Sequence, residues 1–401
     1  MNILFIHQNF PGQFVHLAAD LASQKAHRVF ALSICEQPVP AGVRLRLYTM
    51  LRAAAPETHP LLLDQEAKIL RAEACAAAAM QLKREGFVPD LIIAHPGWGE
   101  ALFIKDVFPA ARLAIYCEYY YAPEGQDVGF DPEIPPLTLE QRYKLRLKNT
   151  TNLLSLEAAD VAIAPTEWQR STYPLWAQSK IAVIHDGIDL ERLNHRPKAR
   201  LRLAANEWHP QLDLFVGDEV LTYVARNLEP VRGFQVLMRA LPDVLARRPK
   251  AHVLIVGGDD VGYGHLAPAG LSWRTHLLNE LGSQIDRSRV HFLGRVPEQT
   301  YLDLLSISRT HVYWTTPFVL SWSFLEAALA GVPMLASATP PVQEFAAQMG
   351  VQTLDFYDSS GFAQAIAERL SAPPKLRQPR VVPQISVREC VAAQKALFGL
   401  T

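Results

Sequence analysis

Apolar residues in the first half of the chain follow two alternating patterns, short continuous runs and longer stretches with apolar positions at helical spacing. The short runs predict buried strands at residues 2–7, 28–33, 90–95, 111–118, 160–164 and 181–185. Helical spacing predicts helices at about residues 13–25, 65–84 and 139–158. Alternation of this kind is typical of βαβ units, in which helices cover both faces of a parallel sheet.

A second series of the same kind begins at residue 220. Strands are predicted at residues 220–225, 252–256, 290–293, 311–314 and 333–336. Helices are predicted at residues 233–247, 273–281, 300–308, 321–330, 361–370 and 386–398. The chain is therefore expected to be α/β, with two doubly wound, Rossmann-like domains. Ligands of such sheets bind outside the carboxyl ends of the strands, so the cleft between two facing domains is the expected site.

Chain length and the weak pattern between the two series set the expected domain limits. At 401 residues the chain is too long for one ordinary core. Residues 192–218 are polar, contain Pro and lack a clear period. We expect an N-terminal domain at 1–190, a linker at 191–218 and a second domain at 219–375. The last segment, 376–401, is expected to form a helix that packs back toward the first domain.

Composition excludes several classes of partner and cofactor. The 39 Lys and Arg residues nearly balance the 40 Asp and Glu residues, so no global charge favours nucleic acid, and we expect no nucleic-acid partner. The four cysteines are scattered, without metal-ligand spacing, and are expected to be reduced. We therefore expect no metal site.

The chain opens directly on a strand pattern, and no apolar run reaches the ~18–20 residues that a membrane span needs. We expect a cytoplasmic protein. Basic residues occupy every second position of a segment within the helix predicted at 139–158, so they do not line one face of that helix. A solvent-exposed surface explains them most simply. They are Arg142, Lys144, Arg146 and Lys148. A peripheral contact with the inner face of the membrane stays open, and the oligomeric state is not indicated.

Two arginines follow the strand predicted at 220–225. Arg226 comes directly after it, and Arg232 lies six residues further on, just before Gly233 and the next helix. Both would extend from a loop at the carboxyl end of a strand. Two guanidinium groups there could clamp a diphosphate, because their planar forks match phosphate oxygens. Ordinary surface arginines are the alternative.

A helix that opens near Ser321 offers a second anion-binding feature. Backbone N–H groups of Ser321 and Trp322 would lie at its N-terminus, where they favour an anion. Glu326 follows within the first turn and a half. Its carboxylate can accept hydrogen bonds from a vicinal diol such as the ribose 2′- and 3′-hydroxyls, although a simple dipole-complementing role stays open.

Four segments of the chain resemble motifs of the retaining glycosyltransferases of family 4. Residues 226–233 resemble the arginine-containing loop of that family, and residues 325–333 (LEAALAGVP) resemble its LEAMAxGxP motif. Residues 290–297 (VHFLGRVP) and the DGID turn at 186–189 match two more of its motifs. The opening segment, 2–14, is similar to a bacterial branch of the family. The resemblance spans nearly the whole chain and implies the GT-B fold.

The resemblance also implies roles for individual residues. Arg226 and Arg232 would hold the donor diphosphate and stabilise its charge as it leaves, and Glu326 would bind the ribose. The Arg295–Val296 segment would meet the nucleobase, largely through its backbone. The amides at Ser321 and Trp322 would add to the diphosphate grip. Gly12 would let the first loop of the N-terminal domain approach the phosphates and the reacting sugar.

One position departs from the family pattern. The family commonly has two glutamates flanking seven residues, and the first contacts the transferred sugar. Counting back from Glu326, that position is Phe318. An apolar ring cannot accept a hydrogen bond from a sugar hydroxyl, so another group is expected to do this work.

The sugar and acceptor side is expected in the first half. Where the family often has a histidine after the strand predicted at 111–118, this chain has Glu118. His95, which ends the preceding strand, is the alternative residue for this place. A carboxylate at Glu118 would stabilise a forming oxocarbenium ion, so it is the catalytic candidate here. Trp98 and Tyr119 could stack on an acceptor, and ordinary packing roles stay open for both and for His95.

The sequence as a whole predicts a metal-independent glycosyltransferase. It would move a sugar from a UDP- or GDP-linked donor to a saccharide or lipid-linked acceptor in polysaccharide or glycoconjugate synthesis, with no cofactor. Two alternatives share the fold: a sugar-nucleotide epimerase, and a nucleotide-sugar-binding regulatory or partner subunit without turnover, which Phe318 favours. A dinucleotide-dependent dehydrogenase is disfavoured, because Gly12 stands alone after the first strand where a GxGxxG motif would be needed.

Overall fold

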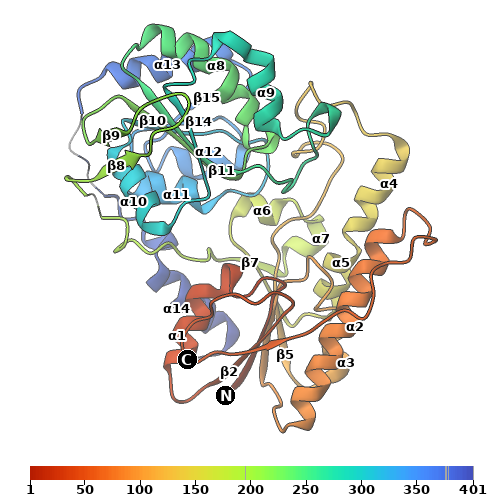
Figure 1. The fold of residues 1–401 in the computed structure, drawn as a ribbon. Helices are drawn as coiled ribbons and strands as arrows, with labels where there is room; N and C mark the ends of the chain where they lie inside the picture. The colour runs from red at the N-terminus through yellow and green to blue at the C-terminus, as the bar shows by residue number, and fades with distance from the viewer. Residues whose placement is uncertain (195, 375–376, 378, 401) are drawn as a thin grey trace. The chain divides into compact units, whose positions relative to one another are not determined.

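The computed structural model describes residues 1–194, 196–374, 377 and 379–400. The chain divides into two compact units (Figure 1). Unit 1 comprises Met1–Gly187 together with Pro383–Thr401, and unit 2 comprises Ile188–Val382. The chain therefore leaves the first unit once and returns to it with its last segment.

Unit 1 is built on a seven-stranded sheet in which every pair of neighbouring strands is parallel. The spatial order is β3-β2-β1-β4-β5-β6-β7. The strands are β1 (Asn2–Ile6), β2 (Arg28–Ser33), β3 (Arg44–Leu47), β4 (Leu91–Ala94), β5 (Arg112–Tyr116), β6 (Val161–Ala164) and β7 (Ile181–Val183). The four residues of β4 are all buried, as expected for a strand covered on both faces.

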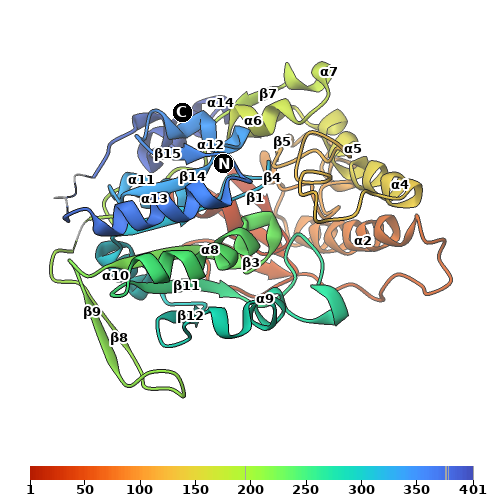
Figure 2. The same ribbon diagram turned by 90° about the horizontal axis from the view of Figure 1, so that it is seen from above.

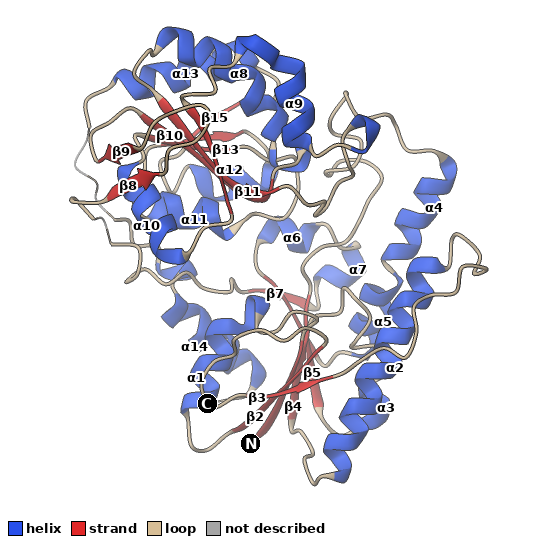
Figure 3. Ribbon diagram, viewed as in Figure 1, coloured by secondary structure: helices blue, strands red, loops and turns tan. Residues whose placement is uncertain are grey.

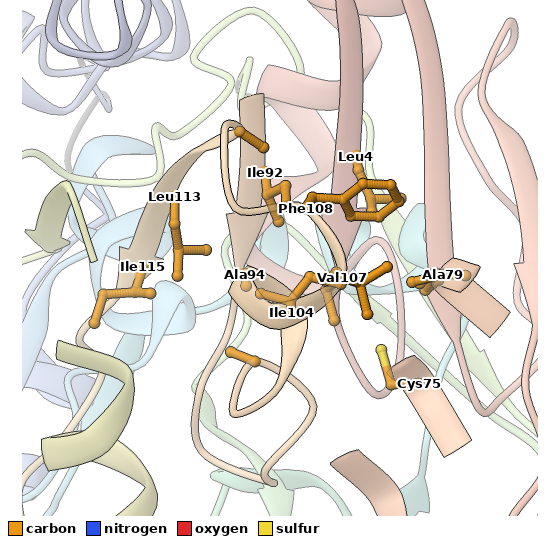
Figure 4. Close-up of a cluster of buried hydrophobic side chains, with 14 of the residues drawn as sticks. Leu4, Cys75, Ala79, Ile92, Ala94, Ile104, Val107, Phe108, Leu113 and Ile115 are labelled. Atoms are coloured by element: carbon orange, nitrogen blue, oxygen red, sulfur yellow. The ribbon is translucent and has the colours of Figure 1, made fainter. Parts of the chain in front are cut away.

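Helices cover both faces of this sheet (Figure 3). They are α1 (Val15–Ser23), α2 (Leu63–Arg84), α3 (Ile104–Val107), α4 (Leu139–Lys148), α5 (Thr150–Ala158), α6 (Glu167–Ser171), α7 (Leu175–Gln178) and α14 (Val387–Phe398). One core lies between the sheet and α2 with α3, and Figure 4 shows Cys75, Ala79 and Val107 gathered there. The other core lies against α1 and α14.

The C-terminal helix α14 has a complete set of end signals. Ser386 accepts a hydrogen bond from the Glu389 amide at the N-terminus, and Gly399 ends the helix with a φ of 75°. The helix is tied to unit 1 by hydrogen bonds from the Gln394 side chain to the His185 carbonyl and from Lys395 to Asp20.

Unit 2 carries a six-stranded parallel sheet in the order β12-β11-β10-β13-β14-β15. Its strands are β10 (Val220–Asn227), β11 (His252–Gly258), β12 (Val290–Gly294), β13 (Thr310–Tyr313), β14 (Met334–Ser337) and β15 (Gln352–Leu354). Its helices are α8 (Phe234–Arg247), α9 (Trp273–Leu281), α10 (Glu298–Ile307), α11 (Trp322–Leu329), α12 (Pro340–Ala346) and α13 (Ser359–Ser371). Helices α8, α9 and α13 lie on one face, and α10, α11 and α12 on the other (Figures 2 and 3).

The prediction that residues 191–218 form a linker is wrong. The segment belongs to unit 2 from Ile188 onward and contains an antiparallel pair, β8 (Arg200–Leu203) and β9 (Leu212–Phe215). Leu201 and Leu203 are buried and β8 packs beside α10, while the alternating arginines face solvent. The alternation in RLRL is a strand pattern, but four residues are too few for it to stand out in a polar segment.

The single helix predicted at 139–158 is also wrong. The structure ends α4 at Lys148 and begins α5 at Thr150, with Asn149 between them. The Asn149 side chain donates to the Tyr121 carbonyl at 2.8 Å and accepts from the Tyr121 amide at 2.9 Å. An amide group committed to a distant backbone favours a turn at this position over a continuous helix.

Candidate active site

The order of the strands in unit 2 reverses between β10 and β13. Strands β11 and β12 follow β10 on one side, whereas β13, β14 and β15 run to the other side. Ligands of open α/β sheets bind at such a switch point, outside the carboxyl ends of the strands. The residues after β10 and β13 are therefore the first place to look for chemistry.

Arg232 lies at this point and is buried, with 9% of its surface exposed. Its Nη1 donates to the Tyr313 hydroxyl and the Thr315 hydroxyl, each at 3.1 Å, and to the Val319 carbonyl at 2.8 Å. All three acceptors belong to β13 or to the loop that follows it. The guanidinium therefore fixes the loop that leads into α11 and places a positive charge beside it.

Arg226 is placed differently from Arg232. It lies near the end of β10, within the stretch where the register with β11 shifts, and is exposed. The two arginines predicted as a clamp thus come from the same βα connection, but one is a buried support of the site and the other a surface cation.

Phe318 is buried and packs on Arg232. The Arg232 Cζ lies 5.4 Å from the centre of the Phe318 ring and 5.8 Å from that of Tyr263. The two rings are 4.8 Å apart. An apolar ring in this place shields the guanidinium from water and attracts it through the ring quadrupole. The position that carries a carboxylate in the family pattern here supports the cation.

The N-terminus of α11 is partly satisfied by protein groups. The Ser321 side chain caps the helix by accepting from the Ser323 amide at 3.3 Å. The Ser321 amide itself donates to the Tyr313 hydroxyl at 2.9 Å. Tyr313 therefore joins Arg232 to the helix start, and the Ser321 amide has a protein acceptor in this structure. Trp322 is the first residue of the helix.

Glu326 lies in the second turn of α11 and is 6% exposed. Its Oε1 accepts from the Arg192 guanidinium, and its Oε2 accepts from the Tyr301 hydroxyl at 2.8 Å. Burial and the negative charge of Glu326 raise the pKa of Tyr301 well above its ordinary value, so the phenol stays a donor. The carboxylate predicted to bind ribose is thus buried and held from two sides.

The loop after β11 is anchored by Glu229, which is 2% exposed. Its carboxylate accepts from the backbone amides of Gly262, Tyr263 and Gly264 at 3.0–3.3 Å. This contact holds the Tyr263 ring over Arg232. Arg295 is exposed and pairs with Asp260 at 2.8 Å, and Val296, next to it, is partly buried.

Gly233 allows the βα connection to pass close to β13. Its φ is 64°, and an added Cβ would lie 2.6 Å from the Cβ of Trp314. We expect Gly233→Ala to lower the free energy of unfolding by about 2–4 kcal/mol, from backbone strain and overpacking together. Urea denaturation measures this loss. Gly282→Ala is the control, because Gly282 has a φ of 52° and nothing within 4 Å of an added Cβ. An equal loss at both glycines would contradict the packing constraint.

The carboxyl ends of β1, β4 and β5 in unit 1 carry a buried polar network. The His7 ring nitrogen Nδ1 accepts from the Asn9 amide, so its Nε2 carries the proton and donates to Gln13 Oε1 at 2.9 Å. Gln13 Nε2 then donates to Glu118 Oε1 at 2.7 Å. Burial, with the charge of His95, lowers the pKa of His7 to about 3 and keeps the ring neutral.

His95 approaches the same carboxylate from the other side. Its Nδ1 accepts from the Gly97 amide, and its Nε2 lies 3.4 Å from Glu118 Oε2. Burial raises the pKa of Glu118, but the contact with His95, together with His7 and Gln13, lowers the pKa by more, below its ordinary 4.5. Glu118 is therefore an ionised carboxylate near pH 7, with 28% of its side chain exposed.

The other residues predicted for unit 1 lie around this network. Trp98 stacks on His95 with 4.3 Å between ring centres, and is partly buried. Gly12 has a φ of 49°, and an added Cβ would lie 2.5 Å from the His7 ring. Tyr119 is 5% exposed and donates to Asp127 at 2.7 Å, so its ring is a packing group and not an open stacking surface.

Within the described residues, no group of three or more His, Cys, Asp or Glu side chains could hold a metal ion. No helix in that part of the chain has the length and hydropathy to cross a membrane. Three of the cysteines are buried, Cys35 is partly exposed, and all four are free.

Comparison with known families decides the identity. Residues 25–193 match the glycosyl transferase family 4 group, and residues 218–372 match the glycosyl transferases group 1. The chain belongs to the family-4-like glycosyltransferases. The prediction made from the arginine loop, the LEAALAGVP segment and the other motifs is confirmed. The chain is thus a glycosyltransferase.

Individual relatives agree with this assignment. Spore coat protein SA of Bacillus subtilis (strain 168) is 27% identical over 205 residues, which cover 50% of this glycosyltransferase and 52% of the relative. Sucrose-phosphate synthase from Thermosynechococcus elongatus aligns over 99% of this chain and 96% of its own, with a TM-score of 0.64 and 17% identity. An α,α-trehalose 6-phosphate synthase from Burkholderia multivorans aligns over 100% and 98%, with a TM-score of 0.63 and 12% identity. These neighbours confirm the GT-B fold.

Several residues of the candidate site were not found from the sequence. They are His7, Gln13, Arg192, Glu229, Tyr301 and Tyr313. Gln13 and His7 lie in the opening segment that resembles the family, and Glu229 lies in the arginine loop, so their proximity to motifs was an available signal. Arg192 and Tyr301 reach Glu326 from 134 and 25 residues away in sequence, and no local pattern points to them.

Proposed function

We propose that this glycosyltransferase moves a sugar, with retention of configuration, from a nucleoside-diphosphate sugar to an acceptor hydroxyl. The donor would be UDP- or GDP-linked, and the acceptor a saccharide or a lipid-linked acceptor in polysaccharide or glycoconjugate synthesis. The observation that carries the proposal is the buried Arg232 guanidinium, fixed at the switch point of unit 2 beside the start of α11. Positive charge and helix amides together favour a diphosphate there.

The proposed reaction needs no separate base. The bond from the anomeric carbon to the diphosphate oxygen breaks, and the acceptor oxygen forms its bond to that carbon on the same face. The acceptor proton passes to the leaving diphosphate. Arg232, with Arg226, offsets the charge that develops on the diphosphate, so no metal ion is required. Glu118 supplies a negative charge from unit 1 that stabilises the cationic sugar.

One solved neighbour and one buried carboxylate support the donor class. A solved neighbour from E. coli, with a TM-score of 0.59 and 11% identity, is described as bound with UDP-2-fluoro glucose. The buried Glu326 carboxylate supports ribose recognition, because a carboxylate can accept from both hydroxyls of a vicinal diol.

A screen of thermal stability in the presence of UDP, GDP and their common sugars tests the donor class. We expect one nucleoside diphosphate to raise the melting temperature, and its sugar to be consumed when candidate saccharide acceptors are added. Proton NMR of the product would report the anomeric configuration, which we expect to match the donor. Tight nucleotide binding without consumption of any donor would contradict the proposal and favour a partner subunit.

The ribose contact gives a second expected result. Glu326→Gln removes a charged acceptor, and hydrogen bonds to charged groups contribute about 1.5–3 kcal/mol, so nucleoside diphosphate affinity should fall about ten- to hundredfold. Isothermal titration calorimetry measures the change. Glu280→Gln serves as control, because Glu280 pairs with Arg239 on the surface of the same unit. Equal affinities for the wild type and Glu326→Gln would refute the ribose contact.

A further inference from the structure

Glu326 is oriented by two donors that come from separate parts of unit 2. Arg192 lies close to the beginning of the unit, and Tyr301 lies in the first turn of α10. Each donor takes a different oxygen of the carboxylate. The plane of the carboxylate is thereby fixed, since rotating it would break both hydrogen bonds at once.

Arg192 is itself held in place. Its Nη1 pairs with Glu298 Oε1 at 2.6 Å, and its Nη2 pairs with Glu326. The carboxylates of Glu326 and Glu298 raise the pKa of Arg192 by more than partial burial lowers it. The guanidinium therefore bridges an exposed acid at the start of α10 and a buried acid in α11. The planar fork of arginine suits this bridge, and a lysine ammonium would not span it as well.

The two donors leave room for a ligand on Glu326. An ionised carboxylate offers about four acceptor positions. Arg192 and Tyr301 use one on each oxygen, so further acceptor positions remain on both oxygens of the same fixed carboxylate. A vicinal diol needs two acceptors with a defined separation. A carboxylate that is fixed in advance costs less to order on binding than one that rotates.

We propose that Arg192 is a positioning residue for ribose recognition, which fixes Glu326 so that the chain distinguishes ribonucleoside from 2′-deoxyribonucleoside diphosphates. The inference rests on the proposed function, because it assumes that Glu326 binds the ribose. It assigns to Arg192 a share in substrate specificity although Arg192 does not touch the substrate.

The ratio of two dissociation constants tests this role. Binding of UDP and of 2′-deoxy-UDP is measured by calorimetry, with GDP and 2′-deoxy-GDP in their place if guanine is the base. We expect the wild type to prefer the ribonucleotide by about tenfold or more, and Arg192→Met to reduce this preference to about threefold or less. Arg192→Lys keeps the charge and should retain part of the preference.

Arg196→Met is the matched control. Arg196 lies four residues further along the same segment, is exposed to a similar extent and pairs with Asp303 of the same helix at 3.0 Å. It does not contact Glu326, so the preference should stay at the wild-type value. A merely structural role for Arg192 would weaken both nucleotides equally.

The outcomes separate this inference from the proposed function. A wild-type preference in Arg192→Met, or an equal loss of both nucleotides, overturns the positioning role. If Arg192→Met is too unstable to measure, a wild-type preference in Arg192→Lys together with Arg196→Met does the same. Glu326→Gln decides the underlying assumption: a preference that persists in that variant means that the ribose contact itself is absent.

Discussion

Arg232→Lys is expected to lower kcat/KM for the donor about a hundred- to thousandfold. The lysine keeps the charge, but its side chain is shorter, so its ammonium group does not reach the position of the Arg232 Nη1, which contacts Tyr313, Thr315 and Val319. The loop into α11 would lose its support, and the charge beside the diphosphate would lose its fixed position. Removing one preorganised group of this kind typically costs 10²–10³ in rate. Initial rates of donor consumption measure the effect.

Loss of folding must be separated from loss of the site. Breaking hydrogen bonds of a buried charged group costs about 1–3 kcal/mol of stability, so the melting temperature of the Arg232→Lys variant has to be recorded alongside its rate. Arg274→Lys is the matched control, because Arg274, which pairs with Asp259, also lies close to an aromatic ring, 5.5 Å from the centre of Phe292. A folded Arg232→Lys enzyme with the activity of the Arg274→Lys control would refute the diphosphate role.

Glu118→Gln is expected to lower kcat about a hundred- to thousandfold while leaving donor affinity nearly unchanged. The glutamine can still accept from Gln13, but it carries no charge to stabilise a cationic sugar. Because the proposed diphosphate and ribose contacts lie in unit 2, the loss should fall on kcat and not on nucleotide binding. Saturation kinetics together with nucleotide calorimetry separate the two.

The pH dependence gives an independent check on Glu118. Its pKa is lowered below 4.5, so its charge, and the stability that depends on that charge, are retained at higher pH and lost only as the pH falls through the lowered pKa. Wild-type kcat should therefore stay unchanged through the titration of Glu118 between about pH 5 and 8.

Glu100→Gln is the control for Glu118→Gln. Glu100 has a buried carboxylate, 1% exposed, that is bonded to Tyr48 at 2.7 Å. Equal kcat losses in both variants would indicate a structural effect alone.

Most strands and helices of both units could be predicted because their signals are local, although β3, β15 and α12 were not predicted. Helix α9 runs over Trp273–Leu281, as predicted, and α14 runs over Val387–Phe398, within one residue of the predicted range 386–398. The break at Asn149 could not be predicted, because its cause is a hydrogen bond to Tyr121, 28 residues away. The β8–β9 pair was missed for the same reason: its short strands are stabilised by each other and by α10.

The predicted site residues are placed by contacts that the sequence does not reveal. Ligands of parallel sheets bind outside the carboxyl ends of the strands. This expectation led to Arg232, Glu326, His95 and Glu118, which all follow such strand ends in the structure. Arg226 and Arg232 looked equivalent in the sequence, but the structure shows that Arg232 is buried and Arg226 is exposed. The partners that set the chemistry, such as Tyr313 for Arg232 and Arg192 for Glu326, lie far away in sequence.

Phe318 departs from the family pattern, and its contacts in the structure give this departure a physical explanation. The sequence indicated only that a carboxylate was missing from the sugar side. In the structure the ring lies on the Arg232 guanidinium and against Tyr263. The residue that contacts the donor sugar in its place stays a prediction, with Glu118 as the candidate.

The proposed function requires that unit 2 binds a nucleoside diphosphate at the carboxyl ends of β10 and β13. Hydrogen–deuterium exchange with and without the nucleoside diphosphate that raises the melting temperature tests it most directly. We expect slower exchange in peptides covering residues 226–233 and 313–326, and unchanged exchange in the β8–β9 pair. Protection confined to other segments, with residues 226–233 and 313–326 exchanging as in the free protein, would contradict it.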